Sequence, residues 1–147
     1  MNNLELLHFA GELVRLNPVI SESPVSLVER ILNCGMLSLS HRDIDELHLP
    51  DSVCTNIRLL FLRSLPMTGL PENVSLVLPN VQNLDISGTR VSKLPNMPEW
   101  HDTLESLSIE NTDIDSFESI RGLSRLTRLE ALGPQLKGWP KDPSTIL

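Results

Sequence analysis

The stretch that decides the fold of this chain reads Val81-Gln82-Asn83-Leu84-Asp85-Ile86-Ser87-Gly88-Thr89-Arg90-Val91-Ser92-Lys93-Leu94-Pro95. In its middle, residues 84–86 alternate apolar and polar side chains, which is typical of a short half-buried strand. Ser87-Gly88-Thr89 then ends the strand, and apolar residues return at wider spacing before a proline. Such a unit has one apolar edge that it cannot bury alone, so it predicts further copies of itself.

The same pattern occurs five times along the chain. Its first strand residue is Leu37, Leu60, Leu84, Leu107 and Leu129 in turn, so successive copies lie 23, 24, 23 and 22 residues apart. The second strand residue of each copy is also apolar, and both are expected to point inward. This steady period predicts a solenoid, in which each copy packs against its two neighbours.

With this period the chain resembles the leucine-rich repeat family, whose unit reads LxxLxLxxNxLxxLP. The resemblance covers residues 34–140 and implies an α/β fold. The expected fold is a leucine-rich-repeat solenoid of about five repeats, with a short parallel sheet on the concave face and an N-terminal helical cap. We therefore divide the chain into a cap (1–33), the repeats (34–140) and a C-terminal tail (141–147).

One column of the repeat departs from the family. Where the family has Asn after the strand, this chain has Arg42, Leu65, Thr89, Thr112 and Pro134. A Thr hydroxyl can bond to the backbone left open by the turn, more weakly than an Asn amide, whereas the other three side chains cannot do so in the same way. We expect the first, second and last turns to be less regular than the middle two.

Two helical patterns precede the repeats. The first involves Leu4, Leu7, His8, Gly11, Val14 and Arg15 and stops near Asn17-Pro18. In the second, Ser23 is the expected N-cap, Pro24 the first helical residue and Gly35 the closing residue. Its expected apolar stripe is Leu27, Val28, Ile31 and Leu32. Stacked repeats need a covered end, which two helices would provide.

The second helix has an alternative interpretation as a docking box. Ser26-Leu27 followed by Ile31 loosely resembles the boxes by which leucine-rich-repeat ubiquitin-ligase receptors hold their adaptors, and it resembles an F-box no more closely. The family box has Cys where this chain has Ile31.

The residues between the inward leucines must point outward, because successive side chains alternate along a strand. They form three columns on the sheet: Met36, Leu59, Asn83, Ser106, Arg128; Ser38, Phe61, Asp85, Ser108, Glu130; and Ser40, Arg63, Ser87, Glu110, Leu132. We call this surface the strand face. Aromatic and Arg side chains often anchor interfaces, so its candidate partner-binding residues are Leu59, Phe61, Arg63, Asp85, Glu110, Arg128 and Glu130. A different outcome is that the cap partly covers Phe61.

These observations favour a non-catalytic module that binds a protein partner through the concave face, which members of the family generally use. The alternative is the substrate-recognition part of a ubiquitin ligase or of a secreted bacterial effector. In support of the second, Leu94-Pro95-Asn96-Met97-Pro98 resembles the LPxLP units of bacterial effector repeats. The end of the solenoid after Trp139-Pro140 has three expected fates: covered by the tail, paired in a homodimer, or continued in a longer protein.

No motif for catalysis, phosphate binding or metal binding is present, so we expect no enzyme, cofactor or metal site. Two carboxylate pairs, Asp43/Asp45 and Asp113/Asp115, each flank a buried Ile on an open turn, where acids are solvated. The four histidines are dispersed. Cys34 and Cys54 are expected to point inward, as free thiols in a reducing compartment or, as the alternative, joined in a disulfide. Asn73-Val74-Ser75 matches a glycosylation sequon that we expect to be unused.

The formal net charge of −7 argues against nucleic acid and against an anionic membrane surface as partners. It leaves a basic protein as a suitable partner. Because no apolar run spans a membrane and no signal peptide is recognisable, we expect a cytoplasmic location, in the producing cell or, after delivery, in a host cell.

Overall fold

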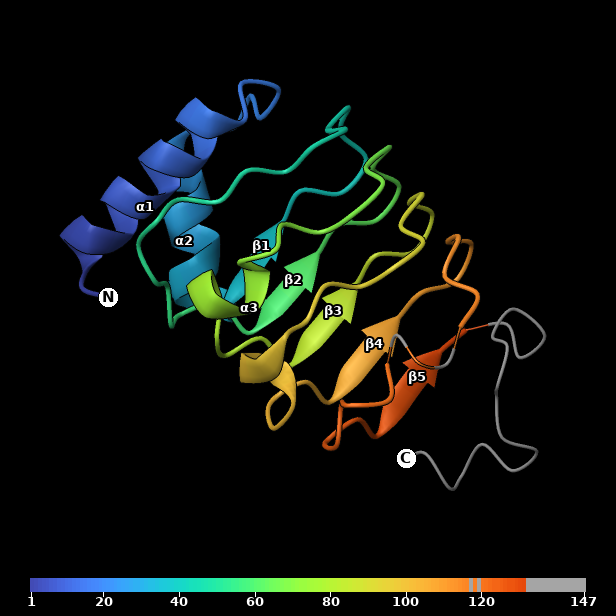
Figure 1. Cartoon of the computed structure of the whole chain (residues 1–147). Helices are drawn as coiled ribbons and strands as arrows, with labels where there is room; N and C mark the ends of the chain where they lie inside the picture. The colour runs from blue at the N-terminus through green and yellow to red at the C-terminus, as the bar shows by residue number, and fades with distance from the viewer. Residues whose placement is uncertain (117, 119, 132–147) are drawn as a thin grey trace.

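The computed structural model describes residues 1–116, 118 and 120–131, in which two helices are followed by a regular stack of coils (Figure 1). The elements, in chain order, are α1 (Asn3–Leu16), α2 (Pro24–Cys34), β1 (Met36–Ser38), β2 (Leu59–Phe61), α3 (Val74–Val77), β3 (Asn83–Asp85), the 3-10 helix η1 (Pro98–Trp100), β4 (Ser106–Ser108) and β5 (Arg128–Glu130). Several predictions concern positions outside the described residues: the C-terminal tail, the end of the solenoid, and Leu132, Pro134, Leu136, Trp139 and Pro140 of the last repeat.

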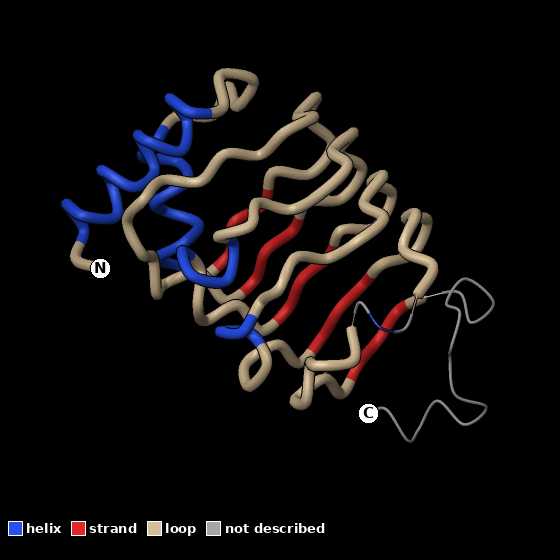
Figure 2. Tube along the Cα trace, viewed as in Figure 1, coloured by secondary structure: helices blue, strands red, loops and turns tan. Residues whose placement is uncertain are grey.

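The five strands form one parallel sheet in the order β1-β2-β3-β4-β5, so each strand pairs with the next along the chain (Figure 2). The register aligns the first leucine of every repeat: Leu37, Leu60, Leu84, Leu107 and Leu129. The chain therefore folds as a leucine-rich-repeat solenoid with a parallel sheet and a helical cap, as the repeat period predicted.

The inward leucines form the core of the solenoid. Leu60, Leu84 and Leu107 are fully buried, and the second inward residues of β1 to β4 are equally inaccessible. Leu129 and Ala131 of the last strand are only partly buried.

Between the strands, Trp100 of η1 reaches into the core and its Nε1 donates a hydrogen bond to the Leu78 carbonyl at 2.8 Å. The short helix α3, which packs against η1, was not predicted.

The cap covers the β1 end of the core, with α2 against β1 and α1 packed on α2 (Figure 1). In α2 the expected ends are confirmed: Ser23 Oγ accepts from Ser26 N at 3.2 Å, and Gly35 is left-handed at φ 64°. Leu32, however, was wrongly placed in the buried stripe, since it is 48% exposed.

The first predicted helix is confirmed as α1, but the residues of the predicted pattern are not the ones that it buries. This helix buries Leu6, Phe9, Ala10 and Leu13, whereas Leu4 is 80% exposed and Leu7 39% exposed. Apolar residues on both sides of the helix satisfy the same period, and the side that holds the bulky Phe is the one that packs on α2. Among the described residues, no helix is long and apolar enough to cross a membrane.

All four described turns after the strands share one backbone conformation, so the expected irregularity of the first two is wrong. The fourth residue after each inward leucine is left-handed, with φ of 62° at His41, 58° at Ser64, 76° at Gly88 and 56° at Asn111. The first three of these residues donate their N–H to the next repeat at 2.9 Å. This ladder fixes the turn without help from the following side chain.

The Thr hydroxyls bond to the backbone as expected. Thr89 Oγ1 donates to the Ile86 carbonyl and Thr112 Oγ1 to the Ile109 carbonyl, both at 2.7 Å. In the same column, Leu65 is buried and adds apolar contact instead of a hydrogen bond.

Candidate partner-binding surface

The strand face has an apolar side over β1 and β2. Register places Met36 beside Leu59 and Ser38 beside Phe61, and all four side chains are half-buried. Arg63, two residues further on, has a 55% exposed side chain. The face therefore presents aliphatic and aromatic groups that water reaches only in part, next to an accessible guanidinium.

Arg63 pairs with a second predicted binding residue on the adjacent strand. Its Nη1 lies 3.3 Å from Oδ2 of Asp85, whose side chain is only 14% exposed. The other carboxylate oxygen of Asp85 accepts from the backbone N of Ser87 at 3.0 Å. Asp85 is therefore fixed by both oxygens, and it orients Arg63 across the sheet.

The centre of the strand face is lined by small residues. Ser87 and Ser108 were predicted to be exposed, but they are only 4% and 7% accessible, and their hydroxyl oxygens lie 2.6 Å apart in a hydrogen bond. Beyond them, Arg128 and Glu130 on β5 pair with each other at 2.7 Å.

Among the described residues of the strand face, Glu110 is the carboxylate that has no partner. It is half-buried, and its carboxylate makes no hydrogen bond or ion pair within the described part of the chain. The structure thus brings Arg63 together with Asp85 and Arg128 together with Glu130, and it leaves Glu110 between the two pairs.

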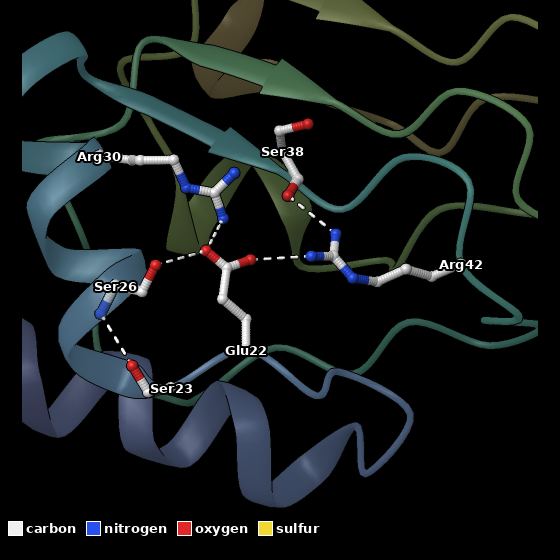
Figure 3. Close-up of polar contacts among 6 residues, drawn as sticks. All are labelled: Glu22, Ser23, Ser26, Arg30, Ser38 and Arg42. Carbon is white, nitrogen blue, oxygen red and sulfur yellow. Dashed lines mark hydrogen bonds and ion pairs between the residues drawn. The ribbon is translucent and has the colours of Figure 1, made fainter.

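A cluster around Glu22 joins the cap to the first repeat (Figure 3). Glu22 Oε2 accepts from Ser26 Oγ at 2.9 Å and from Arg30 Nη2, both of which belong to α2. Its Oε1 accepts from Arg42 Nη2 at 2.8 Å, in the turn after β1. Arg42 also donates to the Ser38 carbonyl at 3.1 Å. One carboxylate therefore connects α2 with the first repeat.

The cluster also protects the outer edge of the sheet. Leu39 and His41 donate toward β2, so alternation directs the Ser38 carbonyl to the unpaired side of β1. Arg42 occupies that acceptor, which an open edge strand would offer to another chain. The sequence reading missed this cluster, because no local pattern connects Glu22 with a side chain twenty residues later.

The docking-box interpretation of α2 conflicts with the packing of its residues. Leu27 and Ile31 are 1% and 2% exposed and belong to the core, and Ser26 is held by Glu22. An adaptor could reach these apolar groups only if α2 left the solenoid.

The two cysteines lie in different surroundings. Cys54 is buried and free, and burial raises the pKa of its thiol. Cys34 is free but exposed, which corrects the predicted inward orientation, because it is the last residue of α2 and precedes the strand. It lines an open hollow of about 660 Å³ together with amides and Arg58, but with no His or carboxylate that could activate it.

The other candidate groups lie on exposed turns or take part in the packing of the coils. The four aspartates of the two carboxylate pairs are exposed, as expected, and each pair flanks a buried Ile. Within the described ranges, no group of three or more potential ligands is placed to hold a metal ion. In the sequon, Ser75 is buried and donates to Glu99 Oε1 at 2.5 Å.

Comparison with known proteins relates the chain to others by fold. No protein-family model matches the sequence, and no curated protein matches it. Among solved structures, the chain is similar to one titled "Structure of Shigella effector LRR domain", with a TM-score of 0.51 and 17% sequence identity. The match covers 90% of this chain and 66% of that chain, so it spans just under two thirds of the solved structure. The similarity supports the leucine-rich-repeat fold.

Proposed function

We propose that this chain is a non-catalytic protein-binding module of the leucine-rich repeat family, and that its partner binds the strand face. The observation that carries the proposal is the half-buried apolar group of Met36, Leu59 and Phe61 beside the exposed Arg63. Such a combination of a large apolar side chain and an oriented guanidinium is common at the centre of protein interfaces.

The shape of the sheet agrees with this role. Five parallel strands at about 4.8 Å spacing give a surface roughly 20 Å wide. A standard interface of about 800 Å² per partner would cover the strands and extend onto the turns beside them. Among the described residues, no group of side chains is placed to hold a metal ion, and the hollow at Cys34 holds no side chain that would activate the thiol.

The experiment is affinity capture from a cell lysate with the wild-type chain and with Phe61→Ala/Arg63→Glu. A control variant, Leu76→Ala/Arg121→Glu, likewise truncates an apolar side chain and reverses the charge of an arginine, but at exposed positions outside the strand face. Circular dichroism must show the same fold for all three chains. We expect the wild type and the control to capture a partner that the strand-face variant does not capture. Equal capture of that partner by all three chains would reject the proposal.

A second candidate is substrate recognition for a ubiquitin ligase or within a secreted bacterial effector. The observation that favours it is the fold similarity to a structure whose title names a Shigella effector, together with the proline-flanked stretch of residues 94–98. If this candidate is right, the strand face should capture its partner from a host-cell lysate and not from a bacterial one.

A further inference from the structure

The strand face carries more carboxylates than arginines, and its ion pairs show which carboxylate is in excess. Its two arginines, Arg63 and Arg128, face three carboxylates. Arg63 pairs with Asp85 and Arg128 with Glu130, so the carboxylate of Glu110 is the one left over in the described part of the chain. Because Glu110 is half-buried, it has lost part of its hydration, and no cation among the described residues pairs with it.

The surroundings of Glu110 allow another molecule to approach it. Ser87 on the β3 side and Ser108 two residues earlier are small side chains that bond to each other, so among the described residues neither of them blocks the approach to Glu110. A cation that reaches Glu110 would form a charge-assisted hydrogen bond in a partly desolvated position, where such bonds are stronger than on an open surface.

The apolar side of the strand face lies two strands away from Glu110. With strands about 4.8 Å apart and a rise of about 3.3 Å per residue, the Cα atoms of Phe61 and Glu110 are separated by roughly 12 Å. In an extended segment, this distance corresponds to about three or four residues.

We propose, resting on the function proposed above, that the partner supplies a cationic and apolar segment. Its Lys or Arg pairs with Glu110, and an aromatic or branched aliphatic side chain three or four positions away packs on Leu59 and Phe61. The net charge of −7 favours the approach of such a segment over an acidic one.

The test is the selection of phage-displayed random linear peptides on the immobilised chain, with counter-selection on Glu110→Lys. We expect the enriched peptides to combine Lys or Arg with an aromatic or branched aliphatic residue three or four positions away. A synthetic peptide of this kind should bind Glu110→Lys and Phe61→Ser at least about tenfold more weakly than it binds the wild-type chain. Binding should change little for Glu46→Lys, a charge reversal at a side chain that is 77% exposed in the loop after β1.

Three results would overturn the inference, and they separate it from the proposed function. Enriched peptides without a cation that still depend on Phe61 would reject the pairing with Glu110 and leave binding at the strand face intact. Peptides that bind all variants equally would reject both. Failure to enrich any peptide on the wild type over Glu110→Lys would reject the cationic segment.

Discussion

Single residues decide the backbone of the turns after the strands. Four equivalent positions have φ between 56° and 76°, yet only Gly88 is a glycine. An L-residue in this region costs about 1–2 kcal/mol, so His41 and Ser64 hold a conformation that their side chains disfavour, whereas Asn111 is of a type that tolerates it. The hydrogen bonds that His41 and Ser64 donate to the next repeat compensate for this cost.

This cost can be measured in a pair of neighbouring turns. Gly88→Ala should lower the free energy of unfolding by about 1–2 kcal/mol, because the backbone is left-handed and the new Cβ would lie 3.1 Å from Ser64 Oγ. Ser64→Gly should raise it by about 0.5 kcal/mol, since the gain from relieved strain exceeds the entropy of the added glycine. In urea unfolding, Gly88→Ala should be less harmful in the Ser64→Gly background; strict additivity would contradict the contact.

The carboxylate of Glu22 should matter more than a carboxylate in an exposed ion pair. Its side chain is 17% exposed and joins two arginines, so Glu22→Gln removes the charge that both require. We expect a loss of about 1–3 kcal/mol, less than the roughly 3–5 kcal/mol for breaking a fully buried pair, because all three side chains remain partly exposed. The control is Glu118→Gln, whose pair with Arg121 is about 70% exposed and should cost less than about 0.5 kcal/mol. Equal losses would mean that the Glu22 cluster does not hold the cap.

At the scale of elements, the strands were predictable and the cap only in part. Each strand has a leucine at constant period with polar neighbours, and this local pattern is enough to fix which residues point inward. Ser23, Pro24 and Gly35 marked the ends of α2 by equally local chemistry. These signals depend on neighbouring residues alone.

What the sequence did not reveal depends on contacts between distant residues. In α1, both Leu4/Leu7 and Leu6/Phe9 fit the helical period, and only packing on α2 selects between them. The helix α3 has four residues and no side-chain cap, too little for a sequence signal. On the strand face, the columns were predictable, but the pairing that isolates Glu110 depends on rotamers of separate strands.

The buried face of α1 can be tested by truncating one side chain on each side. Phe9→Ala should destabilise the chain by about 3–5 kcal/mol, because Phe9 is completely buried between α1 and the rest of the cap. Leu4→Ala removes an apolar group that is 80% exposed, so the change should stay within about 0.5 kcal/mol. Midpoints of urea unfolding would measure both, and a larger loss for Leu4→Ala would mean that α1 packs through the other face.

At the scale of the whole molecule, a solenoid can unfold as one unit or repeat by repeat, because each repeat contacts only its neighbours. The continuous core from Leu6 to Leu126 favours a single transition for the described part of the chain. The two thiols provide a way to test this, since one is exposed on the cap and the other is buried between repeats.

Alkylation with iodoacetamide near pH 8, followed by mass spectrometry, should modify Cys34 in the native protein and leave Cys54 unmodified. Cys54 is inaccessible, and burial raises its pKa, so at this pH it holds less of the reactive thiolate than an exposed cysteine. With increasing urea, Cys54 should become reactive over the same range in which the helical circular dichroism signal of the cap is lost. Cys54 belongs to the segment that connects β1 to β2, and its backbone N–H donates to the Val77 carbonyl of the next coil at 2.8 Å. Modification of Cys54 while the cap remains folded would therefore show that the repeats open independently of the cap.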